Sequence, residues 1–320
     1  MKIFDSRIED GNVNALILVS HEEILDFGSP EGAIENAIQQ FSKDKNTGAL
    51  MYIRVLEMDY QDDGAVMFSF EAAVTPEVKL GKYKNFKLEC LENQDLAQMA
   101  IDTAAGNLEM TVPGLIIDRK LDSMAQQKKA EILQSGSVNA AADMEYILHK
   151  LNDEEEIPKS PEELWDLAMK AAVTYNDMGY TGVEPFVYAL GQVTEADENA
   201  LVALTEERLE EKQSMNPQLL ADELFEVYLK IRKQSYDDWR QENYRTAAEL
   251  CRVDFLLSAV AEKEKIKVTE EEMGNALFTL SDQYQMTKED ILQLVSREAL
   301  EYQIKLGKAR KIITETAKRI

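Results

Sequence analysis

The spacing of apolar residues changes along the chain, from short β-type runs before residue 90 to helical spacing after it. The run "NALILV" (14–19) predicts a strand because it is short, apolar and rich in residues that favour sheets. "LMYIRVLEM" (50–58) and "AVMFSFEAAV" (65–74) predict two more strands. The sequence between them, "DYQDDG", ends in Gly64 and predicts a turn, so these two strands are expected to form a hairpin.

Two helices are predicted within the same region. "SHEE" (20–23) has a Ser and a Glu three positions apart, which is the spacing of a capping box at a helix start. Ser29-Pro30 predicts a second start, because proline suits the first helical turn. The second helix has apolar residues at helical spacing: Ile34, Ile38 and Phe41. We therefore expect residues 1–90 to form an α+β N-terminal domain. The stretch "VTPEVKLGKYKNFKLE" (74–89) is expected to be its last strand or an arm leading out of it.

The rest of the chain has helical spacing. Apolar residues recur every three or four positions in four sets: Leu96, Ala100, Ala104 and Leu108; Ile117, Leu121 and Met124; Leu250, Val253, Leu257 and Val260; and Met273, Leu277, Leu280 and Tyr284. "TEEE" (269–272) and "TKED" (287–290) predict helix starts. We expect residues 91–320 to form a mostly α-helical C-terminal domain, in which the set from Met273 to Tyr284 packs against the helix that carries Leu250–Val260.

Charge is distributed unevenly along this helical region. Residues 153–228 contain 19 Asp and Glu against 4 Lys and Arg, a net of −15 out of −25 for the whole chain. We treat this segment as an acidic insertion; it includes the Gly- and aromatic-rich stretch "YNDMGYTGVEPFVYALG" (175–191). Residues 305–320 instead carry six Lys and Arg against one Glu. The acidic total argues against DNA or an anionic membrane as the main partner.

The sequence also predicts the compartment. The first ten residues, "MKIFDSRIED", contain acidic residues and no apolar core, unlike a signal peptide. No run approaches the ~18 apolar residues that suggest a membrane span. Cys90 and Cys251 lack any metal-ligand spacing and are predicted to be buried, reduced thiols. We expect a cytoplasmic protein that does not contact a membrane.

Catalysis has little support in the sequence. His21 and His149 are far apart, and the chain lacks the common motifs for nucleophilic catalysis, metal binding and nucleotide binding. We therefore predict no catalytic residue, no metal and no cofactor. An enzyme would need a site assembled from distant residues, or one within 175–191.

Two apolar residues are candidates for substrate binding. Phe278 lies one position off the set that begins at Met273, which is about 100° around a helix. Met286 lies in the connection before Thr287. The pattern gives neither residue a role in the core. Methionine is also a flexible side chain that suits adaptable binding surfaces, and the chain has 13 of them.

Three segments resemble a known family. "TPEVKLGKYKNFKLE" (75–89) looks like the junction that ends the N-terminal domain of trigger factor, the bacterial nascent-chain chaperone. "VPGLIIDRKLDSM" (112–124) is similar to the start of that family's C-terminal domain. The third segment resembles its C-terminal helices: "LLSAVAEKEKIKVTEEEMGNALFTLSDQYQMTKEDILQLV" (256–295). With their flanks these segments cover close to a third of the chain, in the family's order.

The chain departs from this family in two places. Trigger factors insert a prolyl isomerase domain after the junction, whereas here only 22 residues separate Glu89 from Val112. A domain usually needs at least about 50 residues, so we expect the isomerase to be absent. The family's ribosome-binding loop has an arginine, whereas "DFGSPEG" (26–32) has none in the comparable region. Residues 1–90 also carry 9 Lys and Arg against 16 Asp and Glu, which leaves the ribosome open as a partner.

The resemblance implies a function. We expect an ATP-independent chaperone that binds unfolded or nascent polypeptides, with a C-terminal domain built of helical arms. The alternative is a helical adaptor or scaffold that binds one specific protein partner. A promiscuous chaperone should suppress aggregation of unrelated denatured proteins, whereas an adaptor should not.

Overall fold

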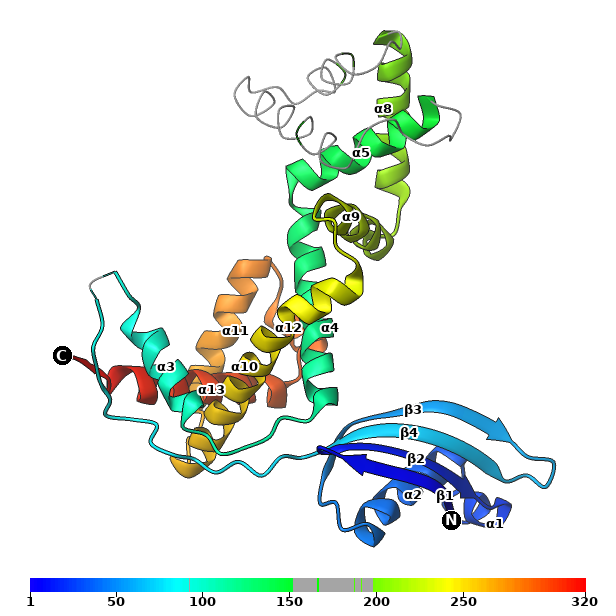
Figure 1. Cartoon of the computed structure of the whole chain (residues 1–320), viewed down its shortest axis with the longest axis vertical. Coiled ribbons are helices and arrows are strands. Elements are labelled where there is room, and N and C mark those ends of the chain that lie inside the picture. Colours follow the sequence, from blue (N-terminus) through cyan, green and yellow to red (C-terminus); the bar gives the residue numbers. More distant parts are fainter. Residues whose placement is uncertain (92, 152–165, 167–186, 188–190, 192–197) are drawn as a thin grey trace. The chain divides into compact units, whose positions relative to one another are not determined.

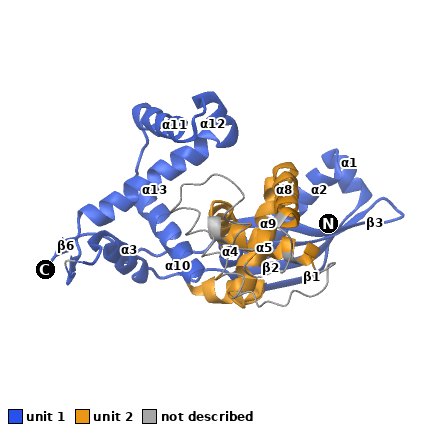
Figure 2. Ribbon diagram, turned by 90° about the horizontal axis from the view of Figure 1, so that it is seen from above, with its two compact units in different colours: residues 1–120, 246–320 blue, residues 121–245 orange. Residues whose placement is uncertain are grey.

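The computed structural model describes residues 1–91, 93–151, 166, 187, 191 and 198–320. These residues form two compact units, one made of residues 1–120 and 246–320 and the other of residues 121–245 (Figure 2). Helices α4 (Gly114–Leu133) and α10 (Tyr236–Lys263) each contribute residues to both units. The domain boundary predicted near residue 90 rests on the change in the spacing of apolar residues, whereas the two units are defined by contacts. The boundary therefore stays a prediction.

The first unit begins with a four-stranded antiparallel sheet in the order β1-β2-β4-β3 (Figure 1). The strands are β1 (Lys2–Glu9), β2 (Asn12–Val19), β3 (Leu50–Tyr60) and β4 (Val66–Val74). The predicted strands and the hairpin at Gly64 are confirmed. Gly64 has a φ of +82°, and a Cβ there would come 2.6 Å from the His21 Nδ1 atom, so this turn needs glycine.

Two helices, α1 (His21–Phe27) and α2 (Pro30–Asp44), follow β2, and α2 packs on one face of the sheet. The predicted starts are confirmed: Ser20 and Glu23 form a capping box, and the Ser29 hydroxyl accepts a hydrogen bond from the Gly32 N–H at 3.1 Å. The buried layer alternates along β2 and β4, as expected for a sheet covered on one side. With the covering helix, the core consists of Val13, Ala15, Ile17, Val19, Ala33, Ile34, Ala37, Ile38, Phe41, Val66, Phe68, Phe70 and Ala72.

The stretch after β4 does not add a strand to this sheet, so that alternative is wrong. Its Lys87–Leu88 portion, β5, pairs in parallel with β6 (Lys318–Arg319) near the carboxyl end of the chain. Tyr83 and Phe86 are buried among helices instead. Burying these aromatic side chains removes a large apolar area from water, which stabilises the stretch in this position. The stretch is therefore an arm that leaves the sheet.

Helices α3 (Leu96–Gly106), α10, α11 (Glu270–Tyr284), α12 (Lys288–Leu294) and α13 (Arg297–Glu315) make up the rest of the first unit together with the beginning of α4. Tyr83 and Phe86 share a core with α3, α10 and α13. The remaining members of this core are Ala100, Ile101, Ala104, Ala105, Leu108, Leu256, Leu257, Val260, Ala261, Leu306, Ala309 and Ile313.

The packing predicted for the set from Met273 to Tyr284 is wrong. Met273 and Leu277 are buried against Ile291 of α12 and Leu300 of α13, and this small core includes no described residue of α10. Tyr284 is 58% exposed, beyond the end of the core. On α10, Leu250 is also exposed, although Leu257 and Val260 are buried.

The second unit is built from the later part of α4, α5 (Gly136–Leu151), α8 (Glu198–Ser214), α9 (Pro217–Ile231) and the start of α10. Its core includes Leu201 of α8, Leu224 and Phe225 of α9, and Trp239 of α10. Residues 198–228 of the predicted acidic insertion are therefore packed helices. The stretches 153–164 and 175–191 lie almost entirely outside the described residues.

Candidate functional site

Helices α11, α12 and α13 expose large apolar side chains around their shared small core. Several large apolar residues there remain in contact with solvent, although burying aromatic and aliphatic groups is favourable. We call them the α11–α13 surface; they are Phe278, Tyr284, Leu292, Leu294, Val295 and Tyr302. Single exposed apolar residues are ordinary, but six within 25 residues form a local concentration that needs an explanation.

Phe278 has the position that the sequence predicted. Its side chain is 64% exposed, one position after the buried Leu277. The 100° turn per residue carries it off the face that packs on α12 and α13. A substrate-binding role for Phe278 stays a prediction that fits this exposure.

Met286 has a different environment from the one predicted. Its side chain is partly buried against the core of Met273, Leu277 and Ile291. The connection is fixed locally, because the Ser281 hydroxyl donates to the Met286 carbonyl and the Met286 N–H donates to the Ser281 carbonyl at 3.1 Å. The assumption that Met286 has no role in packing is therefore wrong, and its suggested contact with a substrate remains untested.

Leu294, the last residue of α12, and Val295, its C-cap, were not predicted from the sequence. Leu294 is 70% exposed, the highest exposed fraction on this surface. Val295 leaves the helix with a φ of −128° and a ψ of 119°, so helical spacing does not apply to it. The one available signal was two adjacent apolar residues directly before Ser296, a residue type that caps helix starts.

Acidic residues surround the α11–α13 surface. Residues 269–302 contain eight Asp and Glu and two Lys and Arg, a net of −6. Like charges of this density oppose association between copies of the chain. They therefore let a soluble protein keep apolar side chains exposed.

Strand β3 is a second exposed apolar region. It is an edge strand, and its large apolar residues are exposed: Tyr52, Ile53, Val55, Leu56, Met58 and Tyr60. The register shifts twice along it, between Met51 and Arg54 and between Val55 and Glu57, and Tyr52 has a φ of +53°. Such irregularities protect an edge from indiscriminate pairing, so β3 is less suited to open-ended strand addition than a flat edge would be.

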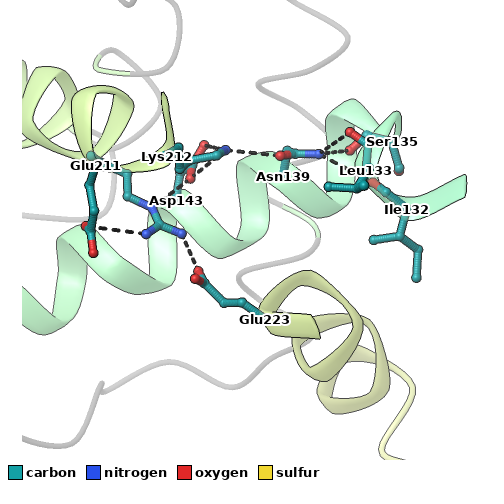
Figure 3. Close-up of polar contacts among 9 residues, drawn as sticks. Ile132, Leu133, Ser135, Asn139, Asp143, Glu211, Lys212 and Glu223 are labelled. Carbon is teal, nitrogen blue, oxygen red and sulfur yellow. Dashed lines mark hydrogen bonds and ion pairs between the residues drawn. The ribbon is translucent and has the colours of Figure 1, made fainter. Parts of the chain in front are cut away.

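The second unit contains a buried cation. Arg208 of α8 is 2% exposed. Its Nε donates to Asp143 of α5 at 3.1 Å, and its Nη2 bonds with Glu223 of α9 (Figure 3). Glu211, one turn further along α8, lies 3.5 Å from its Nη1. Three helices are thereby tied through one guanidinium, whose fork geometry suits several carboxylates.

The network continues to both sides of Asp143. Lys212 donates to both Asp143 carboxylate oxygens, at 3.0 and 2.9 Å, and to the Asn139 amide oxygen at 3.0 Å (Figure 3). The Arg208 guanidinium carbon also lies 4.7 Å from the centre of the Tyr146 ring. Burial and the nearby Glu211 carboxylate raise the pKa of Tyr146 to about 12. Arg208 and Lys212 are both paired with carboxylates of the described residues, so we assign this cluster a structural role.

The described residues contain no group of three or more His, Cys, Asp or Glu side chains that could hold a metal ion. None of the helices in the described part of the chain is both long and apolar enough to cross a bilayer. Cys90 and Cys251 are free and buried, as predicted. Burial raises the pKa of Cys251 to about 11, so its thiolate is scarce at neutral pH.

Comparison with known proteins gives a consistent result. Residues 193–315 match the family described as the bacterial trigger factor protein C-terminus. Trigger factor from Limosilactobacillus fermentum is 29% identical over 108 residues, and trigger factor from Lactobacillus helveticus is 27% identical over 110 residues. Each alignment covers 34% of this chain and 23% of the relative, so it spans about a quarter of the curated proteins.

The solved chains that are similar include one described as "Promiscuous Substrate Recognition in Folding and Assembly Activities of the Trigger Factor Chaperone". The superposition has a TM-score of 0.38 and 11% identity, and it covers 98% of this chain and 99% of that one. The fold and its surfaces define a class of protein with an α+β N-terminal part followed by helices. These helices expose apolar side chains among acidic residues. Over residues 193–315 the chain is similar to the C-terminal part of bacterial trigger factors.

Proposed function

We propose that the chain is an ATP-independent molecular chaperone that binds unfolded or nascent polypeptides and assists their folding. The observation that carries the proposal is the α11–α13 surface, because all three of its helices lie within the segment that matches the family model. Segments of an unfolded chain expose apolar side chains in many orders, and a surface of separate apolar groups can accept them without a fixed partner geometry.

The expected affinity is modest. Burying the exposed part of a side chain such as Phe278 or Leu294 contributes roughly 1–2 kcal/mol. Three such contacts give about 3–6 kcal/mol before the cost of association and of ordering the client is subtracted. Binding should therefore be weak and exchange fast, so a client can leave and fold without nucleotide hydrolysis. The helical arms and cytoplasmic location expected from the sequence belong to this proposal.

We also propose that the chain has no prolyl isomerase module. The 22 residues between Glu89 and Val112 would have to hold it, and α3 occupies half of them. Ribosome docking through the family's loop is not part of the proposal. In "DFGSPEG", Gly28 ends α1 with a φ of +74° and Ser29 caps α2, and the segment supplies no arginine.

The alternative of an adaptor for one partner is favoured by β3 alone. An edge strand with irregular register recognises one complementary strand better than many. A promiscuous chaperone and an adaptor differ in how many denatured proteins they protect.

The experiment measures light scattering of three unrelated denatured proteins after dilution into buffer without ATP. The intact chain should suppress aggregation of all three. The double variant Phe278→Ser, Leu294→Ser should lose most of this suppression, because it removes about 2–4 kcal/mol of apolar contact. The matched control is Leu25→Ser with Leu219→Ser, since these leucines are 66% and 62% exposed elsewhere in the chain.

The control should protect clients as well as the unmodified chain does. Equal loss in both double variants would contradict a site on α11–α13. Suppression of none of the three proteins would contradict the chaperone function and leave the adaptor.

A further inference from the structure

A concentrated basic surface stands out on this acidic chain. It is formed by three segments that are distant in sequence, residues 79–88, 263–267 and 308–319. Together they contain 12 Lys and Arg against two Glu, a net of +10, which leaves −35 on the rest of the chain. We call these three segments the basic surface. The whole-chain charge, which argued against DNA or an anionic membrane as the main partner, conceals this separation.

The fold brings the three segments together. Strand β5 pairs with β6, and the Lys318 N–H donates to the Phe86 carbonyl at 2.9 Å. The Tyr83 hydroxyl donates to Glu264 at 2.6 Å, and the Lys308 ammonium donates to the carbonyl of Lys267 at 2.8 Å. Figure 2 shows β6 close to α3 and the end of α13. All three segments lie over one buried core, so their charges share a rigid support.

Most of these cations have no acidic partner. Lys84 pairs with Glu264, and Lys308 pairs with Glu272. The other ten are exposed and form no ion pair with any described residue: Lys79, Lys82, Lys87, Lys263, Lys265, Lys267, Arg310, Lys311, Lys318 and Arg319. Ten unneutralised cations produce a strong local field, and salt screens the acidic remainder beyond about 8 Å at physiological ionic strength.

The side chains of the basic surface favour one class of ligand over others. A protein partner would need aromatic or aliphatic anchors at the centre of the interface. The three segments have no exposed large apolar side chain; Leu91 and Ile320 flank them. A peripheral membrane site would also gain from such anchors. The backbone of a nucleic acid needs only cations and polar donors.

We infer that the basic surface binds the phosphate backbone of RNA. The choice of RNA over DNA rests on the proposed function, since a chaperone of nascent polypeptides works close to RNA. If about four to six of the ten cations contact phosphates, the affinity should fall roughly 50- to 2,000-fold when salt rises from 50 to 200 mM. Phosphate contacts carry no sequence information, so binding through them should not depend on the RNA sequence.

Fluorescence anisotropy of a labelled 20-nucleotide RNA hairpin with the intact chain tests this inference. The unmodified chain should bind the hairpin with the stated salt dependence. The variant Lys87→Glu, Lys265→Glu, Arg310→Glu takes one exposed residue from each segment and should weaken binding at least tenfold. The control Lys43→Glu, Lys45→Glu, Lys288→Glu makes the same change in charge at exposed positions elsewhere and should change binding less than threefold.

Binding measurements with three other ligands test the choice of RNA. A DNA duplex of the same length should bind no tighter than the RNA, and anionic phosphatidylglycerol vesicles and a poly-glutamate peptide should bind more weakly. Tighter binding of any of these three, no RNA binding at 50 mM salt, or equal loss in the control variant would overturn the inference. The basic-surface variant should still suppress client aggregation, so failure here is distinguishable from failure of the chaperone proposal.

Discussion

Replacing Arg208 with Met should destabilise the second unit by about 2–3 kcal/mol. Losing one partner of a buried ion pair typically costs about 3–5 kcal/mol, because the remaining charge is left unpaired in a poor solvent. Here the penalty is reduced. Asp143 keeps Lys212 at 2.9 Å, and the side chains of Glu211 and Glu223 are 44% and 36% exposed, so water can solvate both.

Urea unfolding monitored by tryptophan fluorescence measures this change. Trp239 is buried in the core of the second unit, so a Trp165→Phe background makes the signal report that unit alone. With a slope of about 2 kcal/mol per molar urea, the midpoint should fall by about 1–1.5 M. Because Met keeps an apolar side chain at this position, the loss of stability reports mainly the removal of the Arg208 charge.

A surface ion pair supplies the matched control. Lys230 contacts Glu145 at 2.7 Å and is 54% exposed, so Lys230→Met should change the free energy of unfolding by under about 0.5 kcal/mol. If Arg208→Met costs no more than this control, the buried network does not hold α5, α8 and α9 together, and the reasoning is wrong.

Three further predictions concern single side chains. In a Cys90→Ser background at pH 8, Cys251 should react with a thiol reagent at least about 100-fold more slowly in the folded chain than in urea, because burial raises its pKa from 9.0 to about 11; a difference under tenfold would refute this. Burial raises the pKa of Tyr146 from 10.0 to about 12, so its contribution to stability is complete below pH 10 and is lost as pH rises through 12. Tyr146→Phe should therefore lose less stability between pH 9 and 11 than the unmodified chain in the same urea assay, and equal losses would contradict the assignment. Urea unfolding followed by circular dichroism compares the exposed Phe278 with the partly buried Met286. Phe278→Ser should change the free energy of unfolding by under about 0.5 kcal/mol, whereas Met286→Ser should lower it by more than about 1 kcal/mol. A larger loss of stability for Phe278→Ser than for Met286→Ser would show that the two environments are misassigned.

Local chemistry explains which parts of the fold were predictable. Ser20 and Glu23 satisfy each other's backbone donors within one turn, so four residues are enough to mark the start of α1. The runs that became β2 and β4 bury alternate residues, and that pattern is visible without any knowledge of the covering helix.

Packing partners were less predictable. The set from Met273 to Leu277 shows which face of α11 is buried but not which helix buries it, and Ile291 and Leu300 were not assigned to it. Tyr284 continues the same face, yet it lies past the end of the core and is exposed. Helical periodicity gives a direction around the axis, whereas contact also depends on the length of the partner.

The charged features of the fold could not be predicted from one sequence. Arg208 lies in "EERLEEK", where an arginine among glutamates is expected to be solvated. Its burial depends on Asp143, 65 residues earlier, and on Glu223 of the next helix. The basic surface likewise depends on the pairing of β5 with β6, two strands more than 200 residues apart in the sequence.

Photo-crosslinking from the α11–α13 surface tests the central claim most directly. A p-benzoylphenylalanine at position 278 should crosslink to a denatured client in the absence of ATP, and excess unlabelled unfolded protein should compete. The same group at position 25, where Leu25 is 66% exposed against 64% for Phe278, should give little product. Strong, competed crosslinking from 278 and weak crosslinking from 25 is the predicted result. Equal yields from both positions, or no adduct from 278, would contradict a polypeptide-binding site on these helices.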